Sequence, residues 1–263
     1  PGLVDHLTNT AVSHCERHRD REQFDRGLDY LSLLPPLYEQ GLPANLVLGF
    51  AATHEQIAEQ RMTDGAAVAE DAVDRGMSPA EIRAARSQLF QEAAVHFEQA
   101  GRYYLEHARL VRITDDEAHG HSLWRSAVCF DRGQLWDQAI KVYGEFVETR
   151  GTDARHLDAI YRLGLAYLAD EQYEPAAEKF RELREENPTA QVSYAAIVPL
   201  ARAYVHLDRP DDAERLLRYV LNDDQYPAQT PESTQYREAL VELGKLYYQQ
   251  GKFKEAEMRQ VEA

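Results

Sequence analysis

Two groups of residues have types and spacing that suit metal ligands. His14 and His18 are four residues apart on an expected helix, with Cys15 beside them, so one helix face would carry both imidazoles. The second group, 115–121, holds three acids and two histidines. The first group lacks a further ligand, and the acids of the second fit the first turn of a helix, where the helix dipole favours negative charge. We therefore expect no metal ion at either place.

No pattern of a catalytic or nucleotide-binding site occurs in the sequence. It has no P-loop, no dinucleotide-binding glycine pattern, no GxSxG elbow and no HExxH. Two cysteines, Cys15 and Cys129, do not make a disulfide framework, and we expect both to be buried structural thiols. These observations predict a protein that is not an enzyme, with no catalytic residues and no cofactor.

The charge of the chain also limits the classes of partner. Its 263 residues carry a formal net charge of -16, which disfavours nucleic acid and anionic membrane surfaces. The longest apolar run, near Leu46 to Ala52, is far shorter than the ~20 residues of a membrane helix, so we expect no direct membrane insertion. The chain opens with Pro1, and we interpret it as a fragment of a longer polypeptide.

The most informative feature is an internal repeat. Leu157–Pro188 reads as two helices joined by a short turn, with Tyr173, Ala176, Phe180 and Leu183 on one face of the second. A pair of small residues twelve apart recurs four times: Ala127 and Ala139, Gly164 and Ala176, Ala201 and Ala213, Gly244 and Ala256. An aromatic residue follows the first member by three each time: Phe130, Tyr167, Tyr204 and Tyr247. Small residues at these places would let paired helices pack closely.

This repeat resembles the tetratricopeptide repeat (TPR) family, over about Gly120 to Ala263. The resemblance implies an all-α fold, a right-handed α-α superhelix of about four helix pairs over 114–263. Departures from the family pattern are Pro210, Gln260 and the long connection Leu221–Ser233. The stretched period is also weakly similar to TPR proteins of the bacterial cell envelope, in outer-membrane assembly and Tol-Pal coordination. On that basis we expect a soluble fragment of a bacterial cytoplasm or periplasm.

Residues 1–113 are helical by pattern without a clean repeat. We expect helices over Arg21–Leu34 and Ala44–Met62, and a long helix that begins with the capping box Ser78–Glu81 and ends near Val111. Cys15, Phe24, Gly27, Leu31 and Leu34 weakly echo the repeat spacing. The region is therefore either a degenerate repeat or a helical cap on the solenoid.

In a TPR stack the first helix of each pair lines a concave groove. The register then predicts these partner-binding residues: Trp124, Arg125, Val128, Arg132, Tyr161, Arg162, Leu165 and Arg202. It also turns eight further residues toward the groove: Ala169, Val198, Pro199, His206, Val241, Glu242, Lys245 and Gln249. We expect a protein or peptide partner with acidic and apolar side chains, unless the arginines pair with neighbouring acids of the chain itself. Two other functions stay open: a module that stacks on copies of itself, and a regulatory domain of an enzyme elsewhere in a longer chain.

Overall fold

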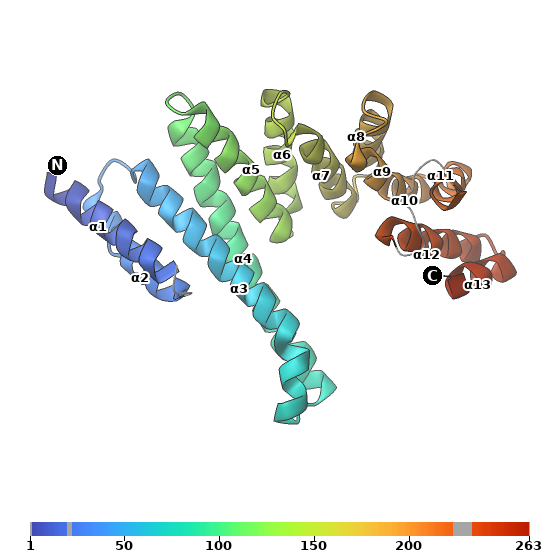
Figure 1. Ribbon diagram of the computed structural model, residues 1–263, viewed down its shortest axis with the longest axis horizontal. Helices are drawn as coiled ribbons and strands as arrows, with labels where there is room; N and C mark the ends of the chain where they lie inside the picture. Colours follow the sequence, from blue (N-terminus) through green and yellow to red (C-terminus); the bar gives the residue numbers. More distant parts are fainter. Residues whose placement is uncertain (1, 20–22, 223–232, 263) are drawn as a thin grey trace. The chain divides into compact units, whose positions relative to one another are not determined.

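The computed structural model describes residues 2–19, 23–222 and 233–262, and every regular element in these ranges is a helix. The elements are α1 (Gly2–Arg19), α2 (Phe24–Ser32), η1 (Pro35–Leu37), α3 (Ala44–Arg75), α4 (Pro79–Val111), α5 (Asp116–Arg132), α6 (Trp136–Thr149), α7 (His156–Ala169), α8 (Tyr173–Glu186), α9 (Gln191–Ala195), α10 (Ile197–His206), α11 (Pro210–Asn222), α12 (Thr234–Gln249) and α13 (Phe253–Glu262) (Figure 1). The all-α prediction is confirmed.

The chain divides into two compact units, Pro1–Val142 and Tyr143–Ala263, and the boundary falls within α6. Each unit is described separately below. The division at residue 113, which the repeat pattern predicts, stays a prediction.

The first unit is dominated by a long antiparallel hairpin of α3 and α4, which run side by side (Figure 1). The predicted end of α3 at Met62 is wrong, because the helix continues to Arg75. Close packing explains the glycine at position 65 inside α3, because a Cβ on Gly65 would lie 2.6 Å from the Phe90 ring of α4. The predicted start of α4 is confirmed, since Ser78 and Glu81 form a reciprocal capping box.

Shorter helices pack against this hairpin. α1 and α2 contact each other and both contact α3, while α5 contacts α4. Cys15, Leu31 and Leu34, which weakly echo the repeat spacing, share one buried cluster with Leu46 and Phe50 of α3. Of the helix predicted over 21–34, the described part begins at Phe24 and ends at Ser32, before the turn at Pro35; Arg21 lies outside the described residues.

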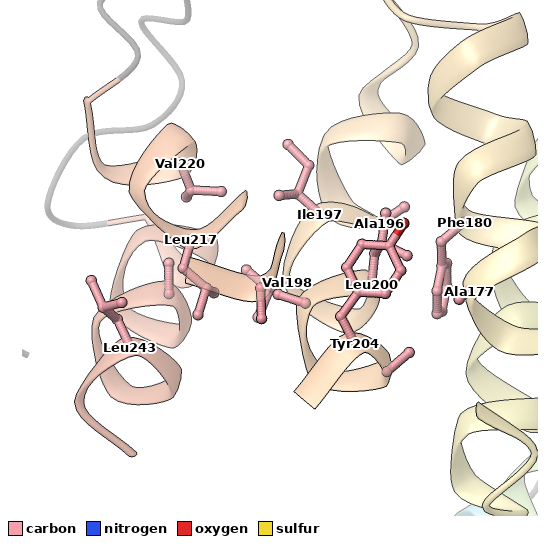
Figure 2. Packing of buried hydrophobic residues seen from close by; sticks show 14 of the residues in the cluster. Ala177, Phe180, Ala196, Ile197, Val198, Leu200, Tyr204, Leu217, Val220 and Leu243 are labelled. Atoms are coloured by element: carbon pink, nitrogen blue, oxygen red, sulfur yellow. The ribbon is translucent and has the colours of Figure 1, made fainter. Parts of the chain in front are cut away.

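The second unit consists of paired antiparallel helices, α7 with α8, α10 with α11 and α12 with α13. The small residues of the repeat are buried where the paired helices meet, as their spacing predicts. A Cβ on Gly164 would lie 2.6 Å from the Phe180 ring, so only glycine admits this approach of α7 to α8. Figure 2 shows the core, in which Phe180 and Ala177 of α8 lie toward Leu200 and Tyr204 of α10.

The repeat pattern does not foresee one break, at Ala196 between α9 and α10. Pro199 lacks an amide hydrogen, so it cannot donate to the carbonyl of Ala195 and the helix is interrupted there. The connection Leu221–Ser233 lies mostly outside the described residues. Among the described helices, none has the length and apolar character needed to cross a membrane.

A candidate protein-binding cleft

The second unit contains a cleft of ≈ 960 Å³ formed by the ends of α7 and α8 and by α10 and α12. It is lined by Leu168, Ala169, Glu171, Tyr173, Arg202, Val205, His206, Asp208, Glu242, Lys245, Leu246 and Gln249. Six of these, Ala169, Arg202, His206, Glu242, Lys245 and Gln249, are groove positions in the repeat register. Two other positions that the register turns toward the groove, Val198 and Pro199, are instead buried in α10.

The basic groups of the cleft are held by acids of α12. The Arg202 guanidinium on α10 lies 3.1 Å from Glu242 and 3.5 Å from Glu238. Lys245 lies 3.0 Å from the same oxygen of Glu242. The side chains of this network are between 17% and 60% exposed, so water screens them in part. Their pairing lowers the positive charge that Arg202 and Lys245 present to a partner.

The apolar part of the cleft is organised by an aromatic stack. The rings of Tyr173 and His206 lie parallel, with centroids 4.2 Å apart, and join the start of α8 to the end of α10. The periodicity assigns Tyr173 to the packing face of its helix, but it lines the cleft, since it occupies the first position of α8. Leu168, Val205 and Leu246 continue the apolar wall. A rigid aromatic plane beside aliphatic side chains is a good surface for an apolar side chain of another molecule.

Three other predicted partner-binding residues lie on α7. Arg162 pairs with Asp158 one turn earlier, with Nε 3.0 Å from the carboxylate. Tyr161 is half-buried, and its burial raises the pKa of its hydroxyl. The charge of Glu238 raises this pKa further, and the charges of Arg162 and Arg202 lower it by smaller amounts. Tyr161, Arg162 and Arg202 are therefore within electrostatic reach of one another. Leu165 packs against the core of the unit.

The remaining predicted residues lie on α5 in the first unit. Trp124 and Val128 are half-buried. Arg125 pairs with Glu55 of α3, and Arg132 forms a two-point pair with Glu59, one turn further along α3. These two arginines thus tie α5 to α3. A single partner-binding surface that includes these residues together with Tyr161 and Arg162 would span both units, and it stays a prediction.

Glu55 is the centre of a buried polar cluster that the sequence does not reveal. Its side chain is only 6% exposed and accepts hydrogen bonds from Arg125, from the Tyr104 hydroxyl at 2.8 Å and from the Cys129 thiol at 3.6 Å. Burial, and then the charge of Glu55, raise the pKa of both the Tyr104 hydroxyl and the Cys129 thiol. The thiolate is therefore disfavoured, as expected for a structural cysteine. No local signal relates Glu55 to Arg125, which is seventy positions away.

The two cysteines and the histidines and acids that suit metal ligands have other contacts in the described part of the chain. Cys15 and Cys129 are both buried and not joined in a disulfide. His14 and His18 both stack on Tyr30 of α2, at 5.5 and 5.3 Å between centroids. Asp115 caps α5 by accepting from the amide of Ala118 at 2.9 Å. Within the part of the chain that the structure describes, no group of three or more histidine, cysteine or acidic side chains is arranged to hold a metal ion.

Comparison with known structures shows the same fold in other proteins. MamA 41-end from Desulfovibrio magneticus RS-1 is 18% identical, with a TM-score of 0.50 over 66% of this chain and 90% of that one. BtubC from P. vanneervenii is 16% identical, with a TM-score of 0.50 over 77% and 87%. The apo form of RapI is 9% identical, with a TM-score of 0.54 over 96% and 74%. At these identities the likeness establishes the fold alone.

Comparison with sequences identifies the repeats themselves. No curated protein sequence gives a match, and these comparisons give no support to the weak similarity to outer-membrane assembly and Tol-Pal proteins. Two models described as tetratricopeptide repeat match residues 121–150 and 167–230. The first segment covers most of α5 and all of α6, and the second covers the end of α7 and all of α8 to α11. The resemblance found in the repeat pattern is thereby confirmed over these two segments, which match the tetratricopeptide repeat.

Proposed function

We propose that this protein is a non-catalytic scaffold that holds an extended segment of a partner protein in the cleft of the second unit. Tetratricopeptide repeats generally serve as protein-interaction scaffolds. The single observation that carries the proposal here is the cleft itself, ≈ 960 Å³ in volume and lined by equivalent positions of successive repeats. Its size is within the range of ligand sites in proteins.

Apolar side chains of the partner would supply most of the affinity. The stack of Tyr173 on His206 forms a flat wall next to Val205 and Leu246. An aromatic platform loses little side-chain entropy when a partner binds, because it is already ordered. Tyr161 and Leu165 on α7, and Trp124 and Val128 on α5 of the first unit, are the further contacts that we propose.

Acidic side chains of the partner would compete with acids of the chain itself. Arg202 is held by two glutamates of α12, and a partner carboxylate would join or displace Glu242. Arg125 and Arg132 are bound to α3, so we propose that they position α5 and do not bind the partner. The preference for acidic partners therefore rests on Arg202 and, on α7, Arg162.

The test begins with the whole chain as bait and identifies a direct partner by cross-linking and purified reconstitution. Tyr173→Ala and Arg202→Ala should each weaken the binding of that partner about tenfold or more, as central interface residues do. Tyr219→Ala is the matched control, since Tyr219 is an exposed tyrosine of α11 that does not line the cleft. Binding that survives both cleft variants but is lost in Tyr219→Ala would contradict the proposal. Thermal melts of each variant confirm that folding is unchanged.

Self-assembly is a second candidate, favoured by apolar side chains on the last helix pair. Tyr248, Phe253, Met258 and Val261 are between 56% and 83% exposed. A surface of this kind is typical of a contact between proteins. Light scattering over a hundredfold range of concentration separates the two functions, because only self-assembly predicts a mass that grows with concentration. Phe253→Ser should abolish that growth and leave the cleft intact.

A further inference from the structure

A second cavity lies wholly within the first unit, apart from the cleft described above. It has a volume of ≈ 600 Å³ and is enclosed by α1, α3, the end of α4 and the start of α5. Its lining combines an apolar wall, composed of Val12, Leu48, Ala52 and Ala118, with an acidic rim, composed of Glu16, Asp115 and Glu117. None of the predicted partner-binding residues lines it.

The acidic rim shares the cavity with two histidines, His107 and His121. Within the described part of the chain, no lysine or arginine lines the cavity, and Glu16 and Glu117 form no ion pair or hydrogen bond. Asp115 uses one carboxylate oxygen, Oδ1, to cap α5. The three acids come from α1, from the residue before α5 and from the first turn of α5, so they converge only in the folded unit. This contrasts with the cleft, where Arg202 and Lys245 offset the acids.

A buried histidine adds a polar group to the inner surface. His107 of α4 is only 5% exposed and lines the cavity. Its Nδ1 lies 2.8 Å from the Ser122 hydroxyl, and its Nε2 has no hydrogen-bond partner among the described residues. Burial lowers the pKa of His107, an effect larger than the opposing influence of Asp115. When Nδ1 donates to Ser122, a neutral His107 offers its Nε2 lone pair to a donor.

Leu48 of the apolar wall, in the second turn of α3, is 37% exposed. The wall therefore offers aliphatic surface directly beside unpaired negative charge. Phosphates, carboxylates and nucleic acids are repelled by this rim. A side chain with an aliphatic stem and a cationic end matches both parts, because lysine and arginine bury their stems along apolar surface and keep the charge in a polar environment.

We propose that this cavity binds a basic segment of a partner protein, with a lysine or arginine side chain at the acidic rim and an adjacent aliphatic side chain on the apolar wall. The site is independent of the cleft in the second unit and has the opposite charge preference. A partner that carries basic and apolar side chains on one stretch and acidic side chains on another would then use both units.

The experiment measures the anisotropy of fluorescein-labelled nine-residue peptides added to the full chain. The probe has alternating lysine and leucine; the two reference peptides replace every lysine with glutamate, or every leucine with serine. We expect the lysine–leucine peptide to bind at least tenfold more tightly than either reference. Glu16→Gln and Glu117→Gln should each weaken it about fivefold, as expected for loss of one charge contact. Leu48→Asn should weaken it to a similar extent.

A matched control distinguishes binding of the peptide in this cavity from nonspecific attraction of a basic peptide to an acidic protein. Glu185 on α8 is exposed and forms no ion pair in the described residues, so Glu185→Gln changes the net charge equally and should leave binding unchanged. Equal weakening by Glu185→Gln, or equal binding of the three peptides, would overturn the proposal. Loss of peptide binding in Tyr173→Ala with retention in Glu117→Gln would place the peptide in the cleft, which also overturns it. A failure of the cleft proposal leaves these results unaffected.

Discussion

Replacing Arg125 with methionine should destabilise the first unit far more than its position at the surface suggests. Arg125 is itself 40% exposed, but its partner Glu55 is 6% exposed. Without Arg125, the Glu55 carboxylate keeps only the Tyr104 hydroxyl and the Cys129 thiol as donors. An uncompensated buried charge of this kind costs roughly 3–5 kcal/mol.

Water can enter where the guanidinium was, and we therefore expect a loss of about 3 kcal/mol, at the lower end of this range. In Glu55→Gln/Arg125→Met the buried charge is absent, and most of the stability should return.

Urea unfolding followed by circular dichroism at pH 7 measures these differences, with separate transitions fitted where the two units unfold separately. Arg132→Met is the matched control, because Arg132 also joins α5 to α3. Its pair with Glu59 is 35% and 46% exposed, and the loss should stay below about 1 kcal/mol. If Arg125→Met costs no more than Arg132→Met, Glu55 remains hydrated and the reasoning is wrong.

Three other predictions follow from buried groups. Ala176→Leu should overpack the fully buried contact of α8 with α7 and cost about 1–3 kcal/mol in urea unfolding; a neutral result would contradict the repeat register. Burial, and then the charge of His96, lower the pKa of His54 to about 4. As the pH falls, this side chain therefore binds a proton at a higher pH in the unfolded chain than in the folded chain. Stability should be full above pH 6.5 and fall by about 2 kcal/mol between pH 7 and pH 5, and His54→Asn should remove that part of the slope. The buried thiols of Cys15 and Cys129 should react with a thiol reagent only as fast as the protein unfolds; rapid reaction of the native protein would refute their burial.

Much of the fold could be predicted from the sequence because its determinants are local. Pairs of small residues twelve apart, with an aromatic three residues after the first member of each pair, fix which faces of two neighbouring helices meet. Gly164, the first member of one pair, packs against the Phe180 ring. The capping box at Ser78 likewise marks the start of α4 within four residues of sequence. Six residues of the cleft are groove positions of the same register, which sets the direction of a side chain around its helix, whereas Val198 and Pro199 of that register are buried.

The tertiary structure alone decided what the charged residues do. The sequence places Arg125, Arg162 and Arg202 on groove-facing positions, and the folded chain pairs each of them with an acid. Two of these acids, Glu55 and Glu242, lie 70 and 40 positions away from their arginines. Helical periodicity gives the direction of a side chain but not the neighbour that it meets, because that depends on which helices pack together and how each is rotated about its axis.

The acidic cavity of the first unit also depends on which helices pack together. Glu16 belongs to α1 and Glu117 to α5, and no motif joins two residues a hundred positions apart. Only the packing of α1 on α3, and of α5 on α4, brings their carboxylates to one opening. The sequence by itself thus determined the helices, the repeats and their packing faces, through interactions within one or two turns. The pairing of charges and the two cavities were decided by long-range packing.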